Sequence, residues 1–322
     1  MTVTKVSKKE KRPESEKPLN IETVTWEDLT WVNIEYPTER ETDYLAQNYP
    51  FHPLDLDDCL SRIQRPKIDE YKDYLFVVFH FPIFNREARV TSPSQLSVFI
   101  GENYLITVHK GELKPLVKLF RDCQINEDSK QEAFNRGSGY LLYRVVDRLI
   151  DYCLPILNRV VDNIEQVEDD IFADDPRGAI KDLSILRRDI ISFRRIIWPM
   201  RAVIGSLEPK IRRFTKMDLA VYFGDTVDHI DKIWDALDEY KEVIEGLNDT
   251  YDSLATSRTN EVMRMLTVIA TILLPITVVA SLWGMNIPLP FQDSAYSLVF
   301  VFLVMIVIIG GMLFLFRRKH LM

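Results

Sequence analysis

Charged side chains are almost absent from the last sixth of this sequence. Between Arg264 and Arg317 the only acidic or basic residue is Asp293, so segments 265–292 and 294–316 carry no charge. A bilayer core about 30 Å thick needs roughly 20 mostly apolar residues for each helical crossing. This run excludes a wholly soluble protein, and we expect two membrane-spanning helices joined by a short loop.

Cysteine is rare in this sequence, and basic residues are outnumbered by acidic ones. The three cysteines are widely spaced and form no CxxC or Cys/His cluster, which argues against a disulfide framework and a structural zinc site. The net charge of −8 argues against a nucleic-acid partner, which needs a basic face. The five histidines and three cysteines form no nucleophile or metal constellation, so neither an enzyme nor an organic cofactor is expected.

The N-terminus has no apolar core of a signal peptide. Residues 1–20 are rich in Lys, Glu and Pro, and we expect a disordered tail there. Arginines at 258 and 264 precede the first expected span, and three basic residues at 317–319 follow the second. The positive-inside rule therefore places both termini in the cytoplasm and the loop outside. We expect a multi-pass protein of the plasma (inner) membrane.

Residues 21–110 alternate strand-like and helical signals, which predicts a mixed domain. From residue 138 onward strand signals vanish, and apolar residues recur at helical spacing in Ser138–Phe172, in Pro176–Leu207 and from Met217 through the first span. The predicted strands are Leu29–Ile34, Tyr74–Phe84, Leu96–Ile100 and Tyr104–His109, and the early helices are Thr38–Asn48, Pro53–Ser61 and Leu113–Cys123.

The predicted fold class is an α+β cytoplasmic domain with a long α-helical stalk and a two-helix transmembrane hairpin. The expected parts are a disordered tail (1–20), an α/β domain (21–137), an antiparallel helical pair (138–216), a stalk helix (217–263), a first transmembrane helix (264–286), an extracellular loop (287–295), a second transmembrane helix (296–316) and a basic tail (317–322).

Two stripes run along the predicted stalk, two residues out of phase with each other. The apolar stripe needs a partner, and the acidic stripe is either a solvated face or the entrance to a shared axis. The acidic stripe is Asp225, Asp228, Asp231, Asp235, Asp238, Glu242, Glu245, Asp249 and Asp252; the apolar stripe is Val227, Ile230, Trp234, Leu237, Ile244, Leu247, Tyr251 and Leu254.

The same stepping continues into the first span and collects most of its small and hydroxyl-bearing side chains. Polar side chains in a bilayer turn toward protein or water, whereas the second span is almost wholly apolar. We therefore expect the first span to line an axis formed by several copies, with a simple hairpin anchor as the alternative. The stripe in the span is Thr256, Asn260, Met263, Thr267, Ala270, Leu274, Thr277 and Ser281.

The first span ends at Gly284-Met285-Asn286. A glycine at this position can cap the helix in the left-handed conformation, and the exposed carbonyls of a helix C-terminus favour cations. Asn286 adds a neutral amide oxygen. A ring of such groups suits an ion that keeps its water shell, and Mg²⁺ dehydrates reluctantly.

In order and spacing, these residues resemble the CorA family of magnesium channels from about residue 25 to 320. Further landmarks of the resemblance are Thr259-Asn260-Glu261-Val262-Met263, Leu266–Ile272, Pro275, His52-Pro53-Leu54, Gln64-Arg65-Pro66-Lys67, Tyr140-Leu141-Leu142-Tyr143 and Trp198-Pro199. The resemblance implies a funnel-shaped homopentamer in a lipid bilayer, with Mg²⁺ as both substrate and regulatory ligand and Co²⁺ or Ni²⁺ as further candidate ions.

The resemblance also implies roles for individual residues. Gly284, Met285 and Asn286 would form the selectivity filter. An acidic cytoplasmic vestibule would include Glu245, Asp249 and Asp252, and an intersubunit Mg²⁺ held by Asp58 and Asp225 would keep the channel shut. The pore-lining and gating positions would be Asn260, Met263, Leu266, Thr267, Ala270, Leu274, Thr277 and Ser281.

Two alternatives stay open on the sequence. One is a Zn²⁺ or Co²⁺ transporter of the same superfamily, with proton coupling as a further variable. The other is a membrane-tethered structural or signalling protein that conducts no ions and is indifferent to changes at Asn286.

Overall fold

A computed structural model describes residues 18–61, 64–173, 178–215, 217–285 and 296–318. The chain divides into two compact units, Met1–Gly246 and Leu247–Met322. Helix α9 (Ala220–Trp283) contributes residues to both units, and helix α10 (Ser297–Arg318) belongs to the second. Asn286, Asp293 and the rest of the predicted loop lie outside the described residues.

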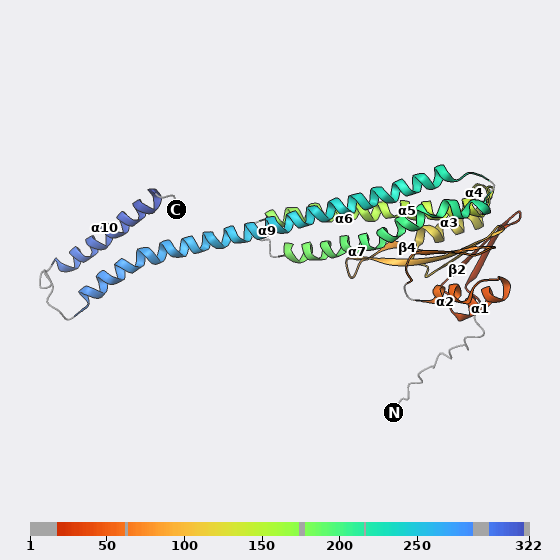
Figure 1. The fold of residues 1–322 in the computed structure, drawn as a ribbon. Helices are drawn as coiled ribbons and strands as arrows, with labels where there is room; N and C mark the ends of the chain where they lie inside the picture. The colour runs from red at the N-terminus through yellow and green to blue at the C-terminus, as the bar shows by residue number, and fades with distance from the viewer. Residues whose placement is uncertain (1–17, 62–63, 174–177, 216, 286–295, 319–322) are drawn as a thin grey trace, which may run out of the picture. The chain divides into compact units, whose positions relative to one another are not determined.

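The first unit is built on a six-stranded sheet with the order β1-β2-β6-β5-β4-β3 (Figure 1). Only the β2–β6 pair is parallel, and every other neighbouring pair is antiparallel. The strands are β1 (Ile21–Trp26), β2 (Leu29–Glu35), β3 (Lys67–Glu70), β4 (Leu75–Asn85), β5 (Val90–Ile100) and β6 (Tyr104–His109).

Helices cover both faces of this sheet. Strand β4 begins with eight consecutive buried residues, which is typical of a strand that has no solvent-facing side. Helices α1 (Glu39–Asn48) and α2 (Pro53–Leu60) pack their buried Leu45 and Leu56 on one face. Helices α5 (Ser138–Asp151) and α7 (Ala179–Gly205) pack against the other face (Figure 1).

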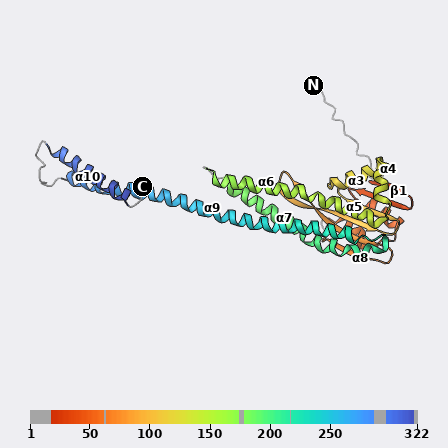
Figure 2. The ribbon, with the colours of Figure 1, turned by 90° about the horizontal axis from the view of Figure 1, so that it is seen from above.

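The remaining helices of this unit pack around that second layer. Helix α6 (Cys153–Phe172) runs beside α7 in both views (Figures 1 and 2). The predicted single helix Ser138–Phe172 is therefore wrong, because it is divided at Tyr152. Pro155 explains the division, since it has no N–H to bond the carbonyl of Asp151 and its ring collides with that carbonyl. The shorter elements are α3 (Lys114–Ile125), α4 (Glu127–Phe134) and α8 (Leu207–Ile211).

The part of α9 that belongs to the first unit packs its apolar stripe against α7, and the start of the helix contacts α5 through Phe223 and Tyr143. Ile230, Leu237 and Ile244 are buried, which confirms the predicted phase of this stripe. Trp234 contacts Trp198 of α7 with ring centroids 4.8 Å apart. The predicted partner of the stripe is therefore found within the same chain.

A polar network is buried under the sheet. The Thr107 hydroxyl accepts a hydrogen bond from Trp31 Nε1 at 3.0 Å and donates to Asn33 Oδ1 at 2.8 Å. Gly111 donates its N–H to His109 Nδ1, so Nε2 carries the ring proton and donates it to Asn33 Oδ1 at 3.0 Å. Burial lowers the pKa of His109 to about 4.

Candidate functional site

Asp58 lies in a cluster of three carboxylates at the end of α2. Oxygens of Asp55, Asp58 and Asp69 all lie within 4.8 Å of one another. Asp55 is buried and accepts hydrogen bonds from the hydroxyls of Tyr71 and Tyr74 at 3.2 and 2.9 Å, while burial raises its pKa. Asp55 and Asp58 lie on helix α2, which begins where His52 caps its first turn by accepting the N–H of Leu54 and Pro53 takes the first helical position.

Lys67 supplies a cation to this cluster. Its Nζ lies 2.7 Å from Asp58 Oδ2 and 2.5 Å from Asp69 Oδ2. The sequence predicted Asp58 alone, because Asp69 and Lys67 belong to β3, a four-residue strand that carries no clear apolar alternation. One positive and three negative side chains leave the cluster acidic.

Asp225 lies near the start of α9, beside other ionisable groups. Its carboxylate is 3.8 Å from His229 Nε2. Asp147 of α5 is half-buried, and its pKa is raised by burial and then by Asp151 and Asp225, with Arg144 and His229 opposing the rise. Asp147 was missed by the sequence analysis, although an acid within the buried stripe of α5 was a signal that could have found it. Among the described residues of this single chain, Asp58 is grouped with Asp55 and Asp69 and not with Asp225, so the intersubunit pairing of Asp58 and Asp225 stays a prediction.

The acidic stripe of the stalk does not form one free face. Asp231 is bound by Arg201 of α7 (Nε to Oδ1, 2.5 Å) and Asp238 by Arg194 of α7 (2.6 Å). These two pairs offset the repulsion expected along the stripe, and they turn part of it toward α7. Asp249 and Asp252 are exposed, and Glu245 contacts Lys241 of its own helix at 3.4 Å.

Two helices are long and apolar enough to cross a membrane, by length and composition: α9 and residues Val299–Arg318 of α10. Only 6% and 0% of their apolar windows are buried in the described structure. Apolar surface of this extent needs a cover of lipid or protein. This observation confirms that the C-terminal part carries two candidate spans.

The predicted pore stripe lies on the uncovered side of α9. Within this part of the helix Val268 is buried and Thr271, Pro275, Val279 and Trp283 are partly covered, and Trp283 contacts Phe300 of α10 with ring centroids 6.1 Å apart. All eight predicted positions are exposed; at 100° per residue six of them lie roughly opposite this face, and Asn260 and Thr267 lie to one side of it. The eight positions are Asn260, Met263, Leu266, Thr267, Ala270, Leu274, Thr277 and Ser281.

The threonines of this stripe hold their protons within the helix. Thr267 Oγ1 donates to the carbonyl of Met263 at 2.7 Å, and Thr277 Oγ1 donates to that of Leu273 at 2.8 Å. A hydroxyl with its donor committed in this way still offers lone pairs as an acceptor. The stripe therefore presents oxygen acceptors and apolar groups but no ionised side chain.

Gly284 ends α9 without the expected left-handed cap. Among the described glycines only Gly111 and Gly137 have positive φ, so that prediction is wrong. Gly284 continues the helical turn, donating its N–H to the carbonyl of Ala280 at 3.0 Å. A Cβ at this position would lie 3.3 Å from the same carbonyl oxygen, so a larger residue would require a shift of a few tenths of an ångström. Met285 follows and is exposed, while the predicted filter residue Asn286 lies outside the described part of the chain.

Comparison with known proteins identifies the family to which these features belong. A sequence model described as CorA-like Mg²⁺ transporter protein matches residues 26–318, nearly the whole chain. The chain belongs to the CorA family. It is thus a member of a family of membrane divalent-cation transporters, and the predicted fold class and family resemblance are both confirmed.

Relatives within the CorA family match most of the length of this chain. The solved structure of the CorA magnesium transporter from Methanocaldococcus jannaschii is 25% identical, covers 92% of each chain and superposes with a TM-score of 0.79. The putative metal ion transporter YfjQ of Bacillus subtilis is 28% identical over 94% of this chain and 93% of its own length. The cobalt/magnesium transport protein CorA of Thermotoga maritima is 28% identical, covering 82% and 73% respectively.

The family also extends to a transporter named for another ion. The zinc transport protein ZntB of Yersinia pseudotuberculosis is 22% identical to this chain and covers 90% of it and 86% of its own length. Membership in the CorA family therefore establishes divalent-cation transport as the class of function and leaves the ion to be assigned.

Proposed function

We propose that this protein is a channel for passive Mg²⁺ influx, assembled as a homopentamer. The observation that carries the proposal is the uncovered stripe of α9, which has no ionised side chain and is rich in hydroxyl and amide groups, in a chain of the CorA family. Two spans per chain cannot enclose a pore, so the stripes of several copies would have to face a common axis.

The proposed permeation path matches the chemistry of Mg²⁺. This ion releases its water reluctantly, and neutral acceptors such as the Thr277 hydroxyl and the Asn286 amide would bind the hydration shell rather than the bare ion. Met263, Leu266 and Leu274 would form an apolar constriction that gates by dewetting. With both termini in the cytoplasm, a potential of 100 mV would drive a divalent ion inward by about 4.6 kcal/mol.

The proposed closing signal is Mg²⁺ bound between Asp58 of one copy and Asp225 of the next. Carboxylates that meet at an interface repel each other until a divalent ion screens them, so the ion favours the closed arrangement. Rising internal Mg²⁺ would therefore stop its own entry. The acidic surroundings of both residues, with Asp55 and Asp69 on one side and Asp147 on the other, support this role.

Flux into proteoliposomes tests the proposal directly. Purified full-length protein would be compared for uptake of Mg²⁺, Co²⁺, Ni²⁺ and Zn²⁺ at fixed voltage and pH. We expect Mg²⁺ uptake that follows voltage and needs no pH gradient. Zn²⁺ uptake driven by a pH gradient would instead assign the chain to the proton-coupled alternative, and no flux at all would assign a non-conducting role.

A matched pair of variants tests the filter. Asn286→Ala should abolish uptake, whereas Asn158→Ala, which removes an exposed amide of α6, should leave it unchanged. Uptake by the Asn286 variant equal to that of the unmodified protein would refute the filter assignment.

A further inference from the structure

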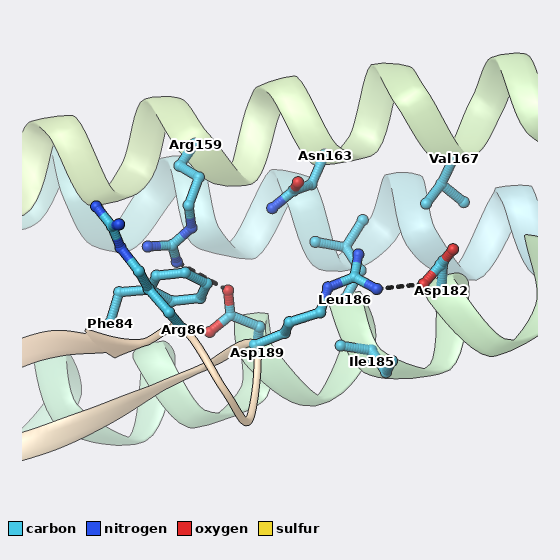
Figure 3. Close-up of a pocket in the computed structure, with 10 residues that line it drawn as sticks. Phe84, Arg86, Arg159, Asn163, Val167, Asp182, Ile185, Leu186 and Asp189 are labelled. Atoms are coloured by element: carbon cyan, nitrogen blue, oxygen red, sulfur yellow. Dashed lines mark hydrogen bonds and ion pairs between the residues drawn. The ribbon is translucent and has the colours of Figure 1, made fainter.

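A cavity of about 210 Å³ lies between the tip of the β4–β5 hairpin and helices α6 and α7, outside the proposed pore and regulatory site (Figure 3). Its lining contains three arginines and two aspartates: Arg86 and Arg89 from the hairpin, Arg159 from α6, and Asp182 and Asp189 from α7. A liquid water molecule takes up about 30 Å³, so the cavity holds several waters or one small anion with waters.

Each of the two carboxylates of the cavity is already paired with an arginine. Asp189 is buried and accepts hydrogen bonds from the N–H of Thr91 at 2.5 Å and from Arg159 Nη2 at 3.0 Å. Asp182 accepts from Arg89 Nη1 at 2.6 Å. The positive charge of the third arginine, Arg86, therefore has no counter-charge among the lining residues.

Three donors of the lining have no partner among the described residues. The guanidinium of Arg86 and the amide of Asn163 make no hydrogen bond or ion pair with them, and Arg159 Nε is buried and unbonded. In Figure 3, Arg159 and Asn163 extend from one helix while Arg86 reaches up from the hairpin on the other side. The buried Arg159 Nε is costly to leave without an acceptor, whereas the exposed Arg86 brings an unpaired positive charge to the mouth of the cavity.

One guanidinium and the backbone of the hairpin tip are held in place before any ligand arrives. The Arg159 guanidinium stacks on Phe84 with its carbon 3.2 Å from the ring centroid, a cation–π contact that fixes its plane. The hairpin tip is fixed by Asn85 Oδ1, which accepts the N–H groups of Glu87 and Ala88, both at 3.0 Å. The guanidinium of Arg159, held in this way, matches oxyanions that can accept several hydrogen bonds at once.

We propose that this cavity binds a phosphate group of a small anion, through Arg86, Arg159 and Asn163. A phosphate carries up to two negative charges and three or more acceptor oxygens, so it meets both the uncompensated charge and the unpaired donors. The same chemistry is offered by free inorganic phosphate and by the terminal phosphate of a nucleotide. This site is independent of ion permeation, and it would let the cytoplasmic unit respond to a phosphate compound.

Calorimetric titration of the purified full-length protein tests this site, with inorganic phosphate and ADP as the two probes. Buffers free of divalent cations are required, since magnesium phosphate complexes would compete. We expect saturable binding of at least one probe with one site per chain, and the probe that binds more tightly identifies the source of the phosphate. Acetate and chloride should bind at least tenfold more weakly.

Two variants and a control locate the site. Arg86→Gln and Asn163→Leu should each weaken binding, by about tenfold for the charged donor. Arg187→Gln removes an exposed arginine of α7 that does not line the cavity, and its affinity should stay within about twofold of that of the unmodified protein. The proposal is overturned by the absence of saturable binding, by full affinity in Arg86→Gln, or by acetate binding as tightly as phosphate.

Discussion

The ammonium of Lys67 lies 2.7 Å from the carboxylate of Asp58, the residue proposed to bind regulatory Mg²⁺. A tethered cation therefore occupies one side of that carboxylate, and a divalent ion has to share it or displace it. The side chain of Asp58 is only 15% exposed, so solvent screens the two charges less than at an open surface. Lys67 should accordingly set how much internal Mg²⁺ is needed for closure.

Lys67→Met should lower the internal Mg²⁺ concentration that half-closes the channel, by about thirtyfold, since the repulsion between a divalent ion and a unit positive charge at roughly 4 Å is worth about 2 kcal/mol in water. Proteoliposome flux at graded internal Mg²⁺ measures this midpoint. Lys210→Met is the matched control, because Lys210 pairs with Glu70 at 2.9 Å on an exposed surface. A midpoint that rises or stays fixed in Lys67→Met would remove Lys67 from regulation.

The orientation of α9 predicts a difference between two threonines of the same helix. Thr277 lies on the uncovered stripe and Thr271 is partly covered, yet both donate their hydroxyls to the carbonyl four residues earlier. Thr277→Val should reduce Mg²⁺ flux about fivefold through loss of an acceptor, and Thr271→Val should change it less than twofold. Because both variants lose the same type of backbone bond, equal effects would show that the stripe does not face the ions.

Buried His109 predicts a loss of stability in mild acid. Its folded-state pKa of about 4 lies below the usual 6.5, so the unfolded chain binds a proton that the folded chain does not between these values. As the pH falls from 6.5 to 5, His109 should remove up to about 1.4 kcal/mol of unfolding free energy per pH unit.

Denaturation of the unmodified protein and of His109→Gln at several pH values measures this contribution. The difference in slope between the two is the relevant quantity, because burial also lowers the pKa of His80 and both proteins retain that residue. Parallel pH dependences in the two proteins would contradict the assignment.

Asp189 should stabilise the first unit strongly. Asp189→Ala leaves the N–H of Thr91 and the guanidinium of Arg159 without their shared acceptor, and should lower the unfolding free energy by about 3 kcal/mol. Asp182→Ala breaks a pair whose side chains are 50% and 32% exposed, and should cost less than about 1 kcal/mol. Chemical denaturation measures the unfolding free energy of both variants. A loss for Asp189→Ala no larger than that for Asp182→Ala would show that water replaces the Asp189 carboxylate as the acceptor.

Apolar runs with clear periodicity predicted the core of the fold. Residues Tyr104–His109 form β6 as predicted, and the helix predicted at Thr38–Asn48 begins one residue later as α1. Strands β1 and β3 were missed because they are edge strands with largely exposed or half-exposed side chains, which leaves little periodic signal. Helix α4 was missed because its eight residues are mostly polar.

Site residues on one helix were easier to predict than sites made from several elements. The phase of α9 follows from helical geometry, so most of the exposed stripe from Asn260 to Ser281 emerged from spacing, whereas Leu266 was added by the family resemblance. The ion pair of Asp58 with Lys67 and the cation–π contact of Arg159 with Phe84 depend on how β3 and the β4–β5 hairpin pack. Contacts of that kind join residues distant in sequence, and local periodicity carries no information about them.

Thr267 and Thr277 donate their hydroxyl protons to carbonyls of their own helix, and this would affect which ions pass a pore lined by α9. At these two threonines only oxygen lone pairs would point inward, so this part of the wall would disfavour anions without any fixed negative charge. A cation passing such a wall would bind weakly at many positions and strongly at none. Rapid passage and discrimination by sign of charge would thus come from the same back-bonded hydroxyls.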